Sequence, residues 1–149
     1  MINDVFIAKV LAITPHHLTL NVMCKYAHYI QDDSNYWSFL GAAWKAGGTY
    51  AEQDKWLTFF RSKRRNKHKI MKTSERREFA KLPKVVTAYR AYGNEEELDS
   101  TICWSLDKKF VEKYAENESR KVAEREFKKS DIFAFFNRRK ESEILVWRD

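Results

Sequence analysis

The ten residues from Lys84 to Gly93 read KVVTAYRAYG, and the pattern of the sequence changes at this stretch. Its β-branched and aromatic residues are typical of a short strand, which we expect over residues 85–89. Before the stretch, apolar residues recur mainly at helical spacing, and after it the apolar runs are short and separated by polar turns. Helices followed by strands predict an α+β fold. We expect a single domain, helical and basic over residues 1–83 and β-rich over residues 84–149.

Apolar periodicity predicts several helices ahead of this strand. They are expected over residues 5–11 with a break near Thr14, over 17–30, over 37–44 up to Gly47 and Gly48, from Thr49 or Tyr50 through 56–60, and over 74–82 ahead of Pro83. The polar residues 31–35 are expected to form a turn or a capping cluster.

Beyond the strand we expect a loop over the acidic residues 94–99 and then a helix capped by Ser105 that reaches Ala115. Three further strands are expected over residues 122–127, 132–136 and 144–147.

Composition excludes several classes of protein. No apolar run approaches the roughly 20 residues that a membrane-spanning helix needs. The apolar residues 5–13 are broken by Lys9 and lack the basic start and the cleavage site of a signal peptide. Cys24 and Cys103 match no metal or redox spacing, and the four histidines form no ligand set. We therefore expect a cytoplasmic protein with reduced thiols, no metal site and no membrane contact.

The net charge of +7 is concentrated in the first part of the chain. Residues 1–88 contain 15 Lys/Arg and 7 Asp/Glu, whereas residues 89–149 contain 13 and 14. We call residues 61–72 the basic segment. It could contact phosphates or an acidic partner, or it could be a solvated helix end, and it lacks interleaved aromatic residues for base stacking. Its candidate partner-binding residues are Arg61, Lys63, Arg64, Arg65, Lys67 and Lys69.

Three short motifs in the β-rich part occur in a suggestive order. Arg90 follows the first strand in Tyr-Arg-Ala-Tyr-Gly, Ser105 follows Cys103 and Trp104 ahead of a helix, and Glu141 and Glu143 lead into the last strand. This order resembles the Arg–Ser–Glu signature of the ADP-ribosyltransferase superfamily over roughly the last 65 residues. In that signature a strand arginine is followed by a strand with Ser or Thr and then by a Glu-x-Glu turn.

The resemblance implies a small, mostly antiparallel β core of the ADP-ribosyltransferase type. It implies a mono-ADP-ribosyltransferase with NAD as co-substrate and a macromolecular acceptor, more readily a protein than a nucleic acid. Arg90 would bind NAD together with Tyr89 and Trp104, and Ser105 would order the pocket between Arg90 and Glu143. Glu143 would be catalytic, Glu141 would serve an arginine acceptor, and the turn over residues 135–140 would recognise that acceptor.

Elementary chemistry is consistent with these roles. A guanidinium can hold the pyrophosphate of an anionic dinucleotide. A carboxylate stabilises the positive charge that develops on ribose when its bond to nicotinamide breaks. Glu141 and Glu143 face the same side only if the segment between them is extended.

Two features depart from the signature, and a second function remains open. Cys103 stands where many members of the superfamily have Ser or Thr, and the acidic residues 94–99 suit an anionic ligand only if they point away from it.

A small basic transferase would suit a phage or prophage factor that acts on host or defence components. The alternative is a non-catalytic basic binding module or inhibitor that occupies a nucleic-acid-binding surface and needs the basic segment rather than Glu143.

Overall fold

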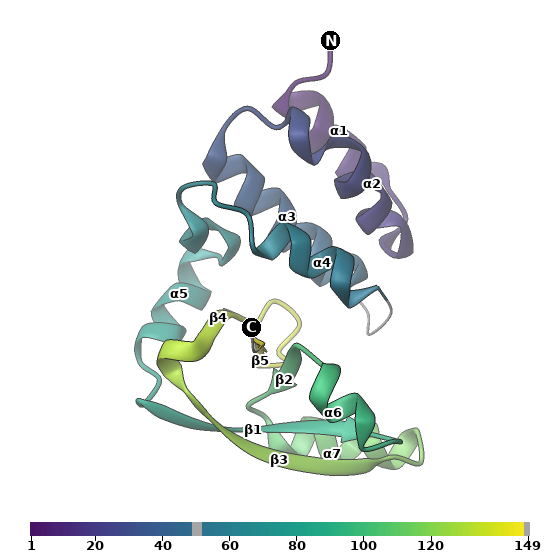
Figure 1. Cartoon of the computed structure of the whole chain (residues 1–149), viewed down its shortest axis with the longest axis vertical. Coiled ribbons are helices and arrows are strands. Elements are labelled where there is room, and N and C mark those ends of the chain that lie inside the picture. The colour runs from purple at the N-terminus through teal and green to yellow at the C-terminus, as the bar shows by residue number, and fades with distance from the viewer. Residues whose placement is uncertain (49–51, 148–149) are drawn as a thin grey trace. The chain divides into compact units, whose positions relative to one another are not determined.

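The computed structural model describes residues 1–48 and 52–147 (Figure 1). The fold is α+β, as expected. The chain forms two compact units, Met1–Met71 and Lys72–Asp149. The change from helices to strands at residues 83–84 does not coincide with the boundary between the units, because helix α5 (Thr73–Ala80) packs against strand β4 of the second unit.

In its described residues, the first unit has helices and 3₁₀ turns joined by loops and no strand. Its elements are α1 (Asp4–Ile13), η1 (His16–Leu18), α2 (Thr19–Tyr26), η2 (Ala27–Tyr29), α3 (Asp33–Gly47), α4 (Gln53–Phe60) and η3 (Lys67–Ile70). The helix expected over residues 17–30 is divided, because short 3₁₀ turns flank α2. The expected start of α4 at Thr49 or Tyr50 lies outside the described residues.

Local capping explains where two of these helices begin. The Asn3 side chain accepts a hydrogen bond from the Phe6 N–H, and Asp32 accepts one from the Asn35 N–H. The polar residues 31–35 therefore act as the expected capping cluster of α3. Gly48 ends that helix, as its position predicts.

Aromatic rings fill the core of the first unit. Trp44 lies edge-on to Trp56 and Phe60, with ring centroids 5.2 and 5.5 Å apart. All three rings are buried. Helix α3 also approaches η3 closely, since a Cβ atom on Gly41 would overlap the Ile70 carbonyl oxygen. This close approach fixes the end of the basic segment against α3.

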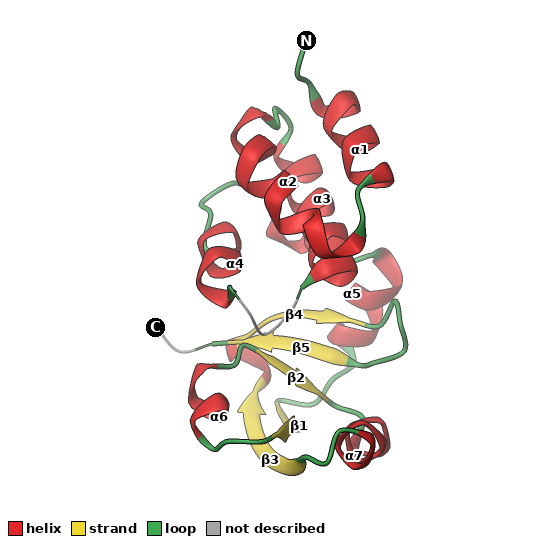
Figure 2. Ribbon diagram, turned by 90° about the vertical axis from the view of Figure 1, so that its right-hand side faces the viewer, coloured by secondary structure: helices red, strands yellow, loops and turns green. Residues whose placement is uncertain are grey.

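The second unit is an antiparallel sheet with helices. Its elements are α5, β1 (Val85–Tyr92), α6 (Glu96–Ser100), β2 (Cys103–Ser105), α7 (Lys108–Asn117), β3 (Lys121–Lys128), η4 (Lys129–Asp131), β4 (Ile132–Phe136) and β5 (Glu143–Val146). The described strands lie in the order β3-β1-β2-β5-β4, and every pair is antiparallel (Figure 2). Helix α7 packs on β1 and β3, where Val111 and Ala115 meet Ala91.

Three expectations for this unit are wrong. Strand β1 continues to Tyr92, because β3 pairs with all eight of its residues, so Arg90 lies inside the strand. Residues 96–100 form helix α6 rather than a loop. The N-cap of α7 is Asp107, which accepts from the Phe110 N–H at 3.1 Å, and Ser105 is instead the last residue of β2.

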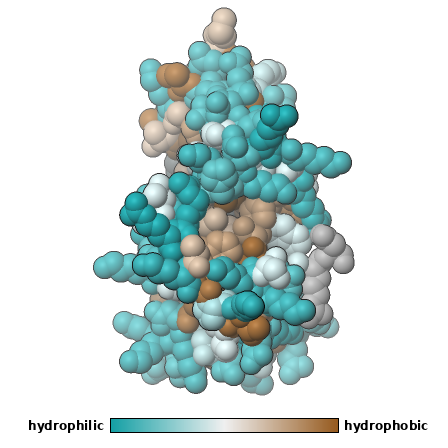
Figure 3. Space-filling model, turned by 90° about the vertical axis from the view of Figure 1, so that its left-hand side faces the viewer, coloured by the Kyte–Doolittle hydropathy of each residue, from teal (hydrophilic) through white to brown (hydrophobic). Residues whose placement is uncertain are grey.

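Figure 3 shows one face of the molecule covered mainly by hydrophilic residues, as a chain with 33% charged residues predicts. Among the described helices, none combines the length and the apolar character that crossing a membrane would require.

Candidate functional site

Three neighbouring strands carry the motif residues. Arg90 lies on β1, Ser105 on β2 and Glu143 on β5, and these strands are adjacent in the sheet. Ser105 is directly opposite Glu143 in the β2–β5 pair and directly opposite Tyr89 in the β1–β2 pair. Directly paired residues share a face of the sheet. The fold therefore places Tyr89, Ser105 and Glu143 on one face of the sheet, whereas Arg90, the next residue on β1, lies on the other face.

Cys103 contacts the Glu143 side chain directly. Its thiol donates a hydrogen bond to Glu143 Oε2 at 2.7 Å. Glu143 is only 7% exposed, so this carboxylate is largely shielded from water. Cys103 and Ser105 are two residues apart on one strand and share a face. Cys103 departs from the Arg–Ser–Glu signature, although alternation along the strand could have indicated its contact with Glu143.

The Arg90 guanidinium lies against β2. Its Nη1 donates to the Cys103 carbonyl oxygen at 3.0 Å, and the side chain is half-buried. Arg90 and Glu143 therefore contact the same residue, one through its carbonyl oxygen and the other through its thiol. A fixed guanidinium of this kind suits a pyrophosphate, because its planar donors match phosphate oxygens.

Ser105 braces the turn that precedes β5. Its hydroxyl donates to the Glu141 carbonyl oxygen at 2.6 Å and accepts from the Asp107 N–H at 3.0 Å. The Leu106 N–H adds a bond of 2.8 Å to the Ser142 carbonyl oxygen. Ser105 therefore links the backbone that follows β2 to the backbone that precedes β5.

The Glu141–Glu143 segment is not extended. Ser142 has φ of 47° and Lys140 has φ of 56°, both in the left-handed region. Glu141 is half-buried and precedes the strand, whereas Glu143 is its first residue. The condition under which both carboxylates would face the same side is therefore not met.

Glu75 on α5 holds the turn between β4 and β5. Its carboxylate accepts from the Asn137 N–H at 2.8 Å and from Arg138 Nε at 3.2 Å, and Oε1 also caps α5 at the Lys72 N–H. Glu75 is 2% exposed. Residues 135 and 136 are buried in β4, so the turn that could meet an acceptor is shorter than expected and covers residues 137–140. Glu75 belongs to none of the sequence motifs, so its contacts with the turn were not predicted.

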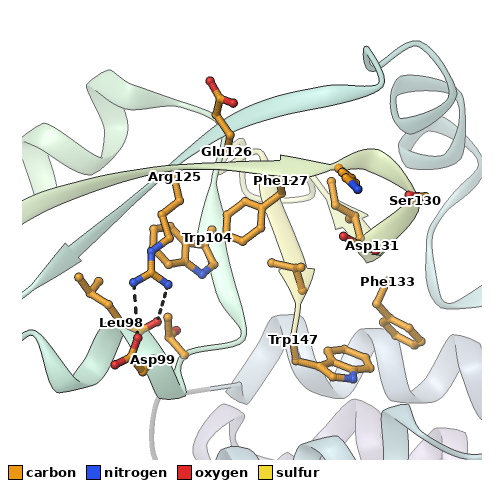
Figure 4. Close-up of a pocket in the computed structure, with 14 residues that line it drawn as sticks. Leu98, Asp99, Trp104, Arg125, Glu126, Phe127, Ser130, Asp131, Phe133 and Trp147 are labelled. Carbon is orange, nitrogen blue, oxygen red and sulfur yellow. Dashed lines mark hydrogen bonds and ion pairs between the residues drawn. The ribbon is translucent and has the colours of Figure 1, made fainter. Parts of the chain in front are cut away.

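Trp104 lies on the opposite face of β2 from Cys103 and Ser105, since successive side chains alternate. Its ring is 5.3 Å from that of Phe127, and the Arg125 guanidinium lies 5.3 Å from its centroid (Figure 4). These three side chains line a pocket of about 1050 Å³ whose lining does not include Arg90, Ser105 or Glu143. Trp104 therefore lies on the opposite face from Tyr89, Ser105 and Glu143, and Arg90 lies on the Trp104 face although it does not line this pocket.

Tyr89 packs towards α7. It lies against the buried group of Ala91, Val111 and Ala115, and Lys108 Nζ is 5.9 Å from its ring centroid. Its pairing with Ser105 still places it on the Glu143 side of the sheet.

The acidic residues after β1 are partly neutralised by arginines. Glu97 pairs with Arg120 at 3.1 Å, and Asp99 lies 3.5 Å from Arg125. Arg125 also donates to the Leu98 carbonyl oxygen at 3.3 Å (Figure 4). These ion pairs reduce the repulsion that helix α6 would exert on an anionic ligand.

The basic segment belongs to the first unit up to Met71. Arg64 is half-buried and points inward, whereas the other candidate partner-binding residues are exposed: Arg61, Lys63, Arg65, Lys67 and Lys69. Within the described part of the chain, no group of three or more His, Cys, Asp or Glu side chains is arranged to hold a metal ion.

Comparison of the chain with protein-family models, with curated proteins and with solved structures finds no match. The proposed function therefore rests on the residues of the site and their contacts.

Proposed function

We propose that this protein is a mono-ADP-ribosyltransferase that takes ADP-ribose from NAD and transfers it to a macromolecular acceptor. The observation that supports the proposal is the arrangement of Arg90, Cys103 and Glu143. These residues lie on three adjacent strands and are joined by hydrogen bonds of 3.0 and 2.7 Å through Cys103. The ADP-ribosyltransferase type of the β core is part of the same proposal.

The proposed reaction breaks one bond and forms one. The bond between the ribose C1′ and the nicotinamide nitrogen breaks, and its electron pair leaves on nicotinamide. A nucleophile on the acceptor, such as an arginine nitrogen, forms the new bond to C1′ and loses a proton. Positive charge develops on the ribose in between, as it does in glycoside hydrolysis.

Each residue has a role that follows from its position. Glu143 would stabilise the charge on the ribose, and its shielding from water strengthens that electrostatic effect. Cys103 would orient the Glu143 carboxylate, which makes it a positioning residue. Arg90 would bind the pyrophosphate. Glu141 lies beside the turn over residues 137–140, and we assign both to the acceptor side of the reaction.

The test is NAD turnover by purified wild type and Glu143→Gln. Nicotinamide release and incorporation of labelled ADP-ribose are measured with free arginine and with a bacterial lysate as acceptors. We expect Glu143→Gln to lower the rate by at least about a hundredfold, as the loss of one electrostatic contact to a transition state does. Glu112→Gln is the matched control, because Glu112 is an exposed carboxylate on α7.

Two results would contradict the proposal. Wild-type protein that neither binds NAD nor releases nicotinamide is not a transferase, and equal rates for wild type and Glu143→Gln would remove Glu143 from the reaction. A non-catalytic binding module would then be the better description. The exposed cations of the basic segment are the observation that favours this second function.

A further inference from the structure

The positive charge of the first unit is concentrated in one short stretch. Residues 1–71 contain ten Lys/Arg and five Asp/Glu, and six of the ten cations lie between residues 61 and 69, where no acidic residue occurs. The remainder of the unit has four Lys/Arg and five Asp/Glu. The charge excess of the unit therefore comes from the basic segment.

Arg64 fixes this stretch to the helices beneath it. Its Nη1 donates to the Ile30 carbonyl oxygen at 2.7 Å and its Nη2 to the Ala27 carbonyl oxygen at 3.2 Å. Its guanidinium also lies 4.6 Å from the Tyr36 ring centroid and 3.5 Å from Asp33. The neighbouring cations are exposed while Arg64 is held inward, so the segment presents them from a fixed backbone.

The two carbonyl groups that Arg64 binds flank an exposed pair of rings. His28 and Tyr29 lie between them in the chain, with ring centroids 4.1 Å apart. Both residues are exposed, and Tyr29 is 46% exposed. The basic segment has no aromatic residues of its own, but the Arg64 hydrogen bonds attach it to the η2 turn that carries this ring pair.

We propose that the basic segment and the His28–Tyr29 pair form a binding surface for single-stranded nucleic acid. Cations that follow a backbone neutralise phosphates and release counterions, and an exposed ring stacks on a base of any sequence. Asp33 pairs with the inward-pointing Arg64, and Lys63 and Arg65 on either side of Arg64 are exposed. The inference concerns the first unit and does not depend on NAD chemistry.

The test uses the full chain and a fluorescent 20-nucleotide oligo(dT), with binding followed by anisotropy at several salt concentrations. We expect Lys63→Glu/Arg65→Glu to weaken binding at least about tenfold and to reduce the slope of log affinity against log salt by about 1.4, since each lost phosphate contact removes about 0.7. We expect Tyr29→Ala to weaken binding about tenfold, the effect of one lost base stack.

Lys109→Glu/Lys113→Glu is the matched control. It makes the same change of charge at two exposed positions of α7 and should leave binding within about twofold of wild type. Equal weakening by the two double variants would show a response to net charge alone and would overturn the proposal. So would an absence of wild-type binding at low salt. Unchanged affinity of Tyr29→Ala, or preference for a duplex of the same length, would overturn the assignment to single strands.

Discussion

At the scale of single residues, the Cys103–Glu143 hydrogen bond is the most informative contact of the site. A thiol is a weak donor, yet here it lies 2.7 Å from a carboxylate oxygen that is nearly closed off from water. Serine at this position would offer a stronger donor of similar size.

We therefore expect Cys103→Ser to retain NAD turnover and Cys103→Ala to lower it by about ten- to a hundredfold, the usual effect of losing a hydrogen bond to a charged group. Initial rates with free arginine as acceptor measure this. A positioning role predicts that the loss appears in kcat and that serine rescues it. A Cys103→Ala variant with wild-type kcat would contradict the role.

Asp4 is a second residue whose contacts lead to a prediction. Burial alone would raise its pKa. Hydrogen bonds from the Asn35 side chain and from the Gln31 and Asp32 N–H groups, together with Arg64, outweigh burial and hold the pKa of Asp4 below its ordinary value of 3.8.

A carboxylate with a lowered pKa stabilises the folded state above its unfolded pKa, and this stabilisation is lost as the pH falls through its folded pKa. We expect Asp4→Ala to have a lower melting temperature than wild type at pH 6 and a smaller difference at pH 3. Calorimetry at both values measures this. A difference in melting temperature that is the same at both pH values would show that the Asp4 charge does not stabilise the folded state.

At the scale of elements, helix α5 and the β4–β5 turn depend on the buried carboxylate of Glu75. Removing one partner of a buried ion pair leaves the other charge uncompensated. We expect Glu75→Ala to destabilise the second unit by about 3 kcal/mol. Urea unfolding followed by circular dichroism measures the loss.

Glu78→Ala is the control for that variant. Glu78 is exposed on the same helix and its carboxylate accepts from the Asn137 side chain at 3.2 Å. We expect it to change stability by less than about 1 kcal/mol. Similar losses for the two variants would argue against a special role for the buried carboxylate.

Elements with a strong local signal were predictable from the sequence. The apolar run IFAFF coincides with β4, and α3 ends at the expected glycines. Helix α6 was missed because Leu98 is the one apolar residue among its five, so the segment shows no apolar period. The Asn94 side chain accepts a hydrogen bond from the Glu96 N–H just before the helix, but this local contact does not distinguish a helix from a loop. The length of β1 was missed because its last three residues depend on pairing with β3 residues that lie 29 to 33 positions later in the chain.

The candidate site was predictable as a set of motifs but not as a geometry. The order of Arg90, Ser105 and Glu143 could be read from the sequence. Their positions on adjacent strands, the contact of Cys103 with Glu143 and the left-handed backbone at Ser142 depend on strand register and on the turn. Trp104 was grouped with Ser105 because it is adjacent in sequence, although alternation along β2 places it on the opposite face from Ser105 and Glu143.

At the scale of the whole molecule, the two proposals concern different compact units. The residues for NAD lie in Lys72–Asp149 and those for nucleic acid in Met1–Met71. The unit boundary was not evident in the sequence, because α5 continues the helical pattern of the first unit while packing on the sheet of the second.

We expect the two activities to be separable by mutation in the full chain. Glu143→Gln should bind oligo(dT) within about twofold of wild type, and Lys63→Glu/Arg65→Glu should modify free arginine within about twofold, since neither change alters the other set of contacts. Anisotropy and nicotinamide release on the same preparations measure this. Loss of both activities in either variant would contradict separability.

The pairing of Ser105 with Glu143 also determines how the site can tolerate changes of chain length. Side chains in a strand alternate with a period of two, so deletion of one residue within β2 would exchange its faces. Trp104 would then occupy the side of Glu143, and the thiol of Cys103 would turn towards Phe127 and Arg125. Substitutions change this site one group at a time, whereas a single deletion would remove all of its contacts together.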